Sequence, residues 1–125
     1  MKILEIADDC IKFDNGYELE YYHSQDCCEN VYADFEILKT YNLSTKTGEK
    51  INIKEIDFEE SLDNLIQEIK GTGFNITSKI GEKFFIPCYN EQNGYYSSDL
   101  ELILYKSSKL KEILDISNCV KDNIY

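Results

Sequence analysis

Two Asn-Gly dipeptides constrain the fold of this 125-residue chain more than any other feature of its sequence. Asn-Gly favours a tight β-hairpin turn, because both residues tolerate the positive φ angles that a type I′ turn requires. The first dipeptide, Asn15-Gly16, lies between residues 10–14 and 17–22, where apolar and polar residues alternate. We therefore predict a hairpin over these two stretches. Its paired apolar positions are Ile11, Phe13, Tyr17, Leu19 and Tyr21.

The second dipeptide, Asn93-Gly94, lies within residues 84–105, which also read as a β-hairpin. After the turn the side chains alternate between the two faces of a strand. One face would carry Tyr96, Leu100, Leu102 and Leu104, and the other Tyr95, Ser97, Asp99 and Ile103. Aromatic rings, amides, hydroxyls and a carboxylate thus crowd around a turn that needs none of them, which suggests a ligand site.

The remaining pattern predicts an α+β fold, with a mainly antiparallel sheet of about six strands built from hairpins and two or three helices. We expect further strands at 2–6, 51–58, 73–79 and 83–90, with Pro87 at a sheet edge or a bulge because it lacks an N–H. Apolar residues at helical spacing predict helices over 57–70 and, at the C-terminal end, over 109–120. A short helix is expected over Val31–Leu38.

The chain is strongly acidic, with 24 Asp and Glu residues against 13 Lys, no Arg and a formal net charge of −11. This balance argues against a DNA-binding or RNA-binding surface, which requires many cations. An acidic surface instead favours solubility or docking onto a basic protein.

Length and composition predict a single domain over residues 1–125, in the cytoplasm. No run of 18 apolar residues predicts a transmembrane helix, and the first residues do not resemble a signal peptide. In that compartment the five Cys are expected to be free thiols.

Three interpretations are open for the polar segment at residues 23–35. His23, Cys27 and Cys28 would be a zinc site, although adjacent Cys residues rarely chelate one ion well. A Cys-His nucleophile oriented by Asp26 would be a catalytic site. The favoured interpretation is local hydrogen bonding by the polar side chains, with no metal, no cofactor and no catalytic residue.

Two motifs in the chain resemble those of a phage and prophage family. The first is YHSQDCCENVY, at residues 22–32, and the second is EQNGYYS, at residues 91–97, which has the pattern E-x-N-G-Y-Y-S. Proteins with this pair of motifs are similar to the Thoeris anti-defence protein 1 family, the viral sponges of a nucleotide signal.

The resemblance implies a binding protein and not an enzyme. It would sequester a cyclic ADP-ribose isomer made by bacterial TIR-domain proteins, glycocyclic ADP-ribose, without cleaving it, and so keep the Thoeris effector inactive. The resemblance also implies a homo-oligomer, which would use the apolar stripe of the C-terminal helix, and separate sites for cyclic oligonucleotides. The alternative is an acidic inhibitor that mimics nucleic acid and binds a host defence protein.

A cyclic ADP-ribose isomer requires ring faces for its base and polar groups for its riboses. We expect Phe84 or Phe85 to stack on the base and Asn93 to provide polar recognition. Further contacts are expected from Glu91, Tyr95, Tyr96 and Asp99, above a floor shaped by His23, Gln25 and Asp26. Without Arg, the pyrophosphate would need backbone N–H groups or one of Lys54, Lys79, Lys83 and Lys106.

Overall fold

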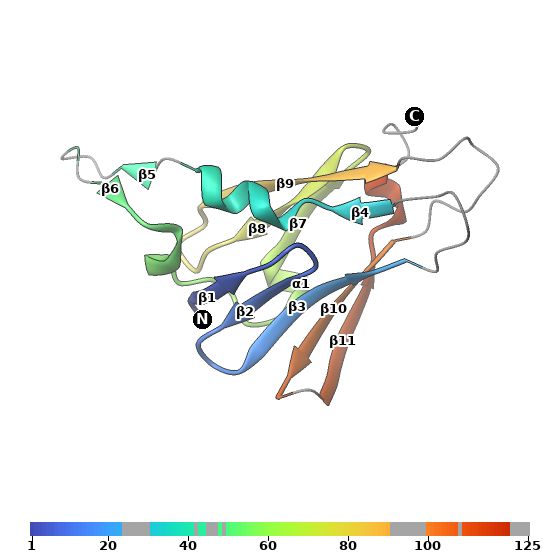
Figure 1. Cartoon of the computed structure of the whole chain (residues 1–125), viewed down its shortest axis with the longest axis horizontal. Coiled ribbons are helices and arrows are strands. Elements are labelled where there is room, and N and C mark those ends of the chain that lie inside the picture. Colours follow the sequence, from blue (N-terminus) through green and yellow to red (C-terminus); the bar gives the residue numbers. More distant parts are fainter. Residues whose placement is uncertain are drawn as a thin grey trace.

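A computed structural model describes residues 1–23, 31–41, 43–44, 48, 50–90, 100–107 and 109–120. Two antiparallel sheets lie one behind the other and share a single apolar core (Figure 1). The mainly antiparallel architecture is confirmed. The expected number of about six strands is too low, because within the described ranges the two sheets contain five and four strands and a further pair lies apart from them.

The first sheet joins strands from the two ends of the chain. Its order is β1 (Ile3–Ile6), β2 (Cys10–Phe13), β3 (Tyr17–Tyr22), β10 (Glu101–Lys106) and β11 (Lys109–Asp115). The central pairing of β3 with β10 thus connects early residues with late ones.

The hairpin predicted at Asn15-Gly16 is confirmed, with Ile11 opposite Leu19 in the register of β2 and β3. Gly16 has a φ of +87° and donates its N–H to the carbonyl of Phe13 at 3.3 Å, while Asn15 keeps a negative φ. This is the pattern of a type I turn followed by a left-handed glycine, in place of a type I′ turn. The Asn15 side chain accepts the N–H of Tyr17 at 3.1 Å.

The second sheet has the order β4 (Val31–Ala33), β9 (Lys83–Asn90), β8 (Gly73–Thr77) and β7 (Ile66–Lys70). The strands predicted on either side of Gly81 are therefore confirmed as β8 and β9. Because β4 pairs only with positions 88–90, Pro87 lies just beyond the end of β4, where the missing N–H is tolerated. A separate small ladder pairs β5 (Leu43–Ser44) with β6 (Lys50–Ile51).

The hairpin predicted over residues 84–105 is wrong. Strand β9 pairs with β4 and β8, whereas β10 pairs with β3 and β11, so the two strands belong to different sheets. The Asn93-Gly94 turn itself lies outside the described residues. A turn preference is local, and it does not decide which strands pair when each finds a better partner elsewhere.

The helix predicted over 57–70 is reduced to α1 (Leu62–Leu65), a single turn that continues directly into β7. Ser61 caps this turn by accepting the N–H of Asn64 at 3.4 Å. Leu62, Leu65 and Ile66 are all buried. Their spacing is compatible with a long helix and also with one helical turn followed by a strand, so it does not distinguish the two.

The predicted C-terminal helix over 109–120 is also wrong, because the segment forms strand β11 and the 3₁₀-helix η3 (Ser117–Val120). Ile113 lies opposite Ile103 and is 53% exposed, while Leu114 packs against the core. The apolar stripe expected for an oligomer contact is therefore divided between the two faces of a strand.

Two other segments differ from their predicted form. The helix expected over Val31–Leu38 is strand β4 followed by the 3₁₀-helix η1 (Phe35–Thr40). The strand expected over 51–58 is interrupted by the 3₁₀-helix η2 (Ile53–Glu55), which Asn52 caps by accepting the N–H of Lys54 at 2.9 Å.

A buried chain of aromatic rings links the two sheets. Phe58 makes edge-to-face contacts with Phe13 of β2, at 6.4 Å between centroids, and with Phe84 of β9, at 5.6 Å. Such pairs add about 0.5–1.5 kcal/mol each beyond the burial of their area. The rings therefore hold the sheets together at the end of the molecule near Met1.

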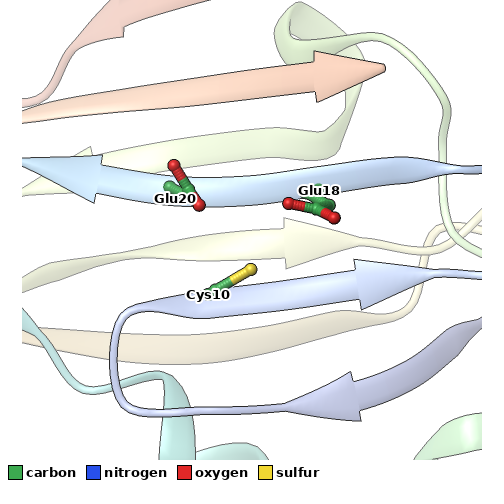
Figure 2. A group of neighbouring side chains, drawn as sticks. All are labelled: Cys10, Glu18 and Glu20. Carbon is green, nitrogen blue, oxygen red and sulfur yellow. The ribbon is translucent and has the colours of Figure 1, made fainter. Parts of the chain in front are cut away.

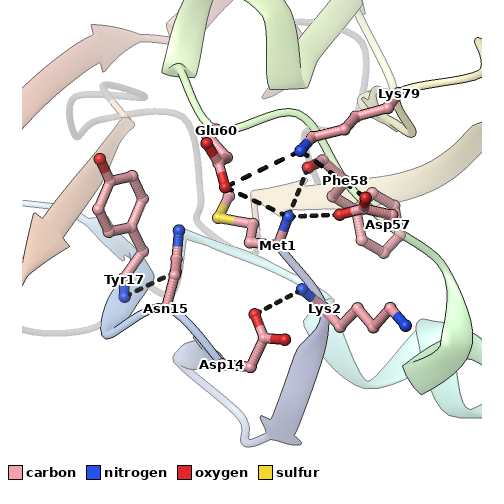
Figure 3. A network of polar contacts seen from close by, with 9 residues as sticks. All are labelled: Met1, Lys2, Asp14, Asn15, Tyr17, Asp57, Phe58, Glu60 and Lys79. Atoms are coloured by element: carbon pink, nitrogen blue, oxygen red, sulfur yellow. Dashed lines mark hydrogen bonds and ion pairs between the residues drawn. The ribbon is translucent and has the colours of Figure 1, made fainter.

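The same end carries a polar network around the Met1 ammonium group (Figure 3). This group donates to Asp57 Oδ1 at 2.6 Å and to the carbonyl oxygen of Phe58 at 2.9 Å. Lys79 lies 3.7 Å from the other oxygen of Asp57, and Glu60 lies 3.7 Å from the ammonium. The network ties the start of β1 to the segment that precedes α1.

Within the described ranges, no helix is long and apolar enough to cross a membrane. The expectation of free thiols is confirmed for Cys10, Cys88 and Cys119, all of which are buried. Cys27 and Cys28 lie outside the described residues.

Candidate functional site

The two motif segments attach to the same end of the paired sheets. Strand β3 ends at Tyr22, beside the start of β10, and Tyr22 is the register partner of Glu101. Strand β4 begins at Val31, beside the end of β9, and Val31 is the register partner of Asn90. Figure 1 shows these four strand ends together at one end of the molecule. Both motifs therefore connect the first sheet to the second between neighbouring points of attachment.

Three of the ten predicted ligand-binding residues fall in the described part of the chain, namely His23, Phe84 and Phe85. His23 directly follows β3 at the motif end and is buried, with 9% exposure. The other seven lie outside the described residues: Gln25, Asp26, Glu91, Asn93, Tyr95, Tyr96 and Asp99.

Phe84 is a core residue and does not present a ring to a ligand. Its side chain is 3% exposed, and its ring packs edge-to-face against Tyr41, at 5.7 Å, and against Phe58. Stacking of a base on Phe84 would require this core to open, so the structure does not support that part of the predicted site.

Phe85 points to the opposite face of β9 and is partly exposed. Its ring lies over Gly73 of the neighbouring strand, where a Cβ atom would come within 2.6 Å of Phe85 Cζ. Its carbonyl oxygen accepts the hydroxyl of Tyr41 at 2.8 Å, beyond the end of β4. Of the two adjacent phenylalanines, only Phe85 has a ring that a ligand can reach.

Phe85 belongs to a row of partly exposed residues on the outer face of the second sheet. We call this the outer aromatic row, and it contains Tyr32, Phe85, Pro87 and Tyr89. Tyr32 and Tyr89 are cross-strand partners with ring centroids 5.3 Å apart and planes inclined by 35°. The row begins at the motif end and follows β9, so it offers ring faces beside the strand ends to which the two motifs attach.

Tyr32 and Tyr89 were not predicted as site residues. The helix predicted over Val31–Leu38 gives Tyr32 no strand partner, and the pattern at Tyr89 predicts only a strand. The available signal was the alternation in residues 83–90, where every second side chain lies outside the core.

Tyr32 also lines a shallow hollow of about 260 Å³ beside the motif end. The hollow is acidic, since three of its lining residues are Asp8, Asp34 and Glu36. Burial raises the pKa of Tyr21, which shares the hollow, and the nearby Asp9 and Asp8 raise it further. Such a surface can accept hydrogen bonds from hydroxyl groups, but it would repel a pyrophosphate.

The lysines considered for phosphate binding are not gathered at the motif end. Lys83 and Lys106 lie at the ends of β9 and β10 that are far from the motif end. Lys83 forms an ion pair with Glu68, and Lys106 lies 5.4 Å from the ring centroid of Tyr17. Lys79 belongs to the Met1 network. Lys54 lines a different hollow, together with Lys39.

Comparison with known proteins relates the chain to one family. No curated protein and no solved structure matches it. One family profile, described as "Domain of unknown function (DUF7448)", matches residues 2–102, which is most of the chain. The chain therefore belongs to the DUF7448 family.

Proposed function

We propose that this protein binds a cyclic ADP-ribose isomer such as glycocyclic ADP-ribose and sequesters it without cleaving it. In this function it acts in the cytoplasm as a viral anti-defence protein that withholds the signal from a Thoeris effector. The observation that carries the proposal is the convergence of two motif segments, which span residues 22–32 and 91–97, on one end of the paired sheets. Separated motifs that meet in space are typical of a binding site.

The outer aromatic row supports the same ligand class. A purine base needs a ring face, and stacking on an aromatic side chain contributes about 1–3 kcal/mol per base. Tyr89 offers a partly exposed ring two residues before the second motif, and Phe85 offers another further along β9. We assign the base to this row and the polar recognition of the riboses to Asn93.

The test is a capture and release experiment. The purified protein is mixed with a TIR-generated cyclic ADP-ribose isomer, free ligand is removed by filtration, and the protein is denatured by heat. We expect intact signal in the second filtrate. Signal lost from both filtrates would instead indicate hydrolysis and would direct attention to His23 and its neighbouring cysteines. Signal that passes through the first filter would overturn the proposal and favour the acidic inhibitor.

Variants locate the site. Asn93→Trp should abolish capture by filling the polar part of the site. Tyr89→Ala should weaken capture by about 5- to 150-fold, which corresponds to about 1–3 kcal/mol. Tyr105→Ala is the matched control, because Tyr105 is a partly exposed tyrosine on the other sheet. Undiminished capture by both Asn93→Trp and Tyr89→Ala would show that this site is wrong.

A further inference from the structure

The outer face of the first sheet holds a mixed cluster of sulfur and oxygen donors, formed by Cys10, Glu18 and Glu20 (Figure 2). Cys10 on β2 is the register partner of Glu20 on β3, and Glu18 lies two residues before Glu20 on the same face. The sulfur and one oxygen of each carboxylate all lie within 4.8 Å of one another. The cluster contains no residue of either motif.

The thiol of Cys10 is buried in this cluster without a hydrogen-bond partner. The residue is 8% exposed, and among the described residues no group donates to its sulfur or accepts from it. Figure 2 shows the sulfur directed toward the strand that carries both glutamates. The buried thiol and the two carboxylates thus bring together three groups that can each bind a metal ion.

The cation beside the two carboxylates, Lys12, makes its ion pair with another residue. In the part of the chain that the structure describes, no ion pair includes Glu18 or Glu20. Lys12, the register partner of Glu18, instead makes its ion pair with Glu5 at 3.7 Å. Burial raises the pKa of Glu20, and the charges of Glu18 and Asp9 raise it further. Anionic groups held together in this way would be stabilised by a bound cation.

We propose that Cys10, Glu18 and Glu20 form a zinc-binding site that joins β2 to β3. Sulfur favours Zn²⁺ over Mg²⁺ and Ca²⁺, which prefer sets of oxygen ligands. Zinc is bound by Cys sulfur at about 2.3 Å and by carboxylate oxygen at about 2.0–2.2 Å. These lengths require donors about 3.5 Å apart in a tetrahedral site. Rotation of the two glutamate side chains can provide that approach, and water fills the fourth position.

Binding must remove the thiol proton, and this gives a second signature. Burial and the charges of Glu20 and Glu18 raise the pKa of Cys10 to about 11, so the free protein carries a neutral thiol at pH 7. When zinc binds, the S–H bond breaks, the proton passes to the buffer, and the electron pair forms the S–Zn bond. We expect release of about one proton per zinc bound.

The experiment titrates metal-free full-length protein with Zn²⁺ alone, by calorimetry in buffers of different ionisation enthalpy, and with Co²⁺ alone, by absorption spectroscopy. We expect one zinc per chain, one proton released, a sulfur-to-cobalt charge-transfer band and a rise in the thermal midpoint with zinc. Cys10→Ser and Glu20→Gln should each weaken binding by about 100-fold or more, since loss of an outer-shell group alone costs about 10- to 100-fold.

Two controls separate this site from other donors. The double variant Cys27→Ser/Cys28→Ser removes the thiols near His23 and should bind zinc as the original protein does. Glu101→Gln removes a carboxylate from the neighbouring strand β10 and should also have no effect. No zinc binding by the original protein, full binding by Cys10→Ser or by Glu20→Gln, or loss of binding in the double cysteine variant would each overturn the proposal.

Discussion

Gly73 is the residue that allows the ring of Phe85, in the outer aromatic row, to lie close over β8. Its φ is +157°, and a Cβ atom there would come within 2.3 Å of the carbonyl oxygen of Ile86 and 2.6 Å of Phe85 Cζ. Glycine in a strand often marks such a close approach of a neighbouring backbone or ring. The absence of a side chain at one position therefore sets the height of a ring on the next strand.

Gly73→Ala should destabilise the protein by about 1–3 kcal/mol, because overpacking forces the neighbouring backbone to shift. Chemical denaturation of the two proteins measures this difference. Gly81→Ala is the control, because Gly81 also has a left-handed φ, +89°, but has no atom within 4 Å of the added Cβ. An equal loss in the two variants would attribute the cost to backbone conformation and not to the contact.

The pair Phe84 and Phe85 shows what a single residue position reveals before the structure is known. Both were predicted to be able to stack on a ligand, since their side chains are identical. The structure places Phe84 in the core and Phe85 on the surface. Adjacent residues of a strand always face opposite ways, but the sequence alone did not show which face of β9 would be covered.

At the scale of elements, local patterns predicted some of the strands, such as β1, β2, β3, β8 and β9, but predicted their long-range partners poorly. The Asn15-Gly16 hairpin formed because the turn joins two alternating stretches directly. Helices were predicted over the segments that form β7 and β11, because Leu and Ile residues there are three and four positions apart. The same spacing also occurs when a short turn is followed by a strand. Pairing such as β3 with β10 depends on long-range packing that no local pattern contains.

Ile113 provides a direct test that β11 is a strand. In a helix its stripe would pack against the sheet, whereas in the strand Ile113 is 53% exposed. Ile113→Ser should therefore change the free energy of unfolding by no more than about 0.5 kcal/mol. Leu102→Ala, in the paired strand and fully buried, should cost about 2–5 kcal/mol. Equal costs, measured by denaturant unfolding, would mean that Ile113 is covered.

At the scale of the whole molecule, the excess of carboxylates is partly compensated by ion pairs with cations. In the Met1 network the cation, the Met1 ammonium group, is buried. The hydrogen bond from the Met1 ammonium, with smaller contributions from Lys79 and Lys2, lowers the pKa of Asp57 below its usual value of 3.8. A carboxyl whose pKa is lower in the folded state stabilises the fold above its unfolded pKa. This stabilisation disappears as the pH falls through the folded-state pKa.

Asp57→Asn should therefore lower the thermal midpoint at pH 7, and the difference from the original protein should shrink as the pH falls below 3.8. The thermal midpoints of the two proteins, measured at intervals between about pH 2 and about pH 7, give this difference on both sides of the pKa. Glu60→Gln is the control, because Glu60 lies 3.7 Å from the same ammonium, too far for a hydrogen bond, whereas Asp57 accepts one at 2.6 Å. A difference that grows in acid would contradict this assignment.

The pairing of β3 with β10 also has a consequence for the order in which the chain can fold. Strands β1 to β3 leave the ribosome first, but the partner that covers the open edge of β3 is made only in the last quarter of the chain. The whole second sheet is synthesised in between. Until then the edge of β3 is free to pair with other chains, so fast synthesis or a chaperone that shields this edge should improve the yield of native protein.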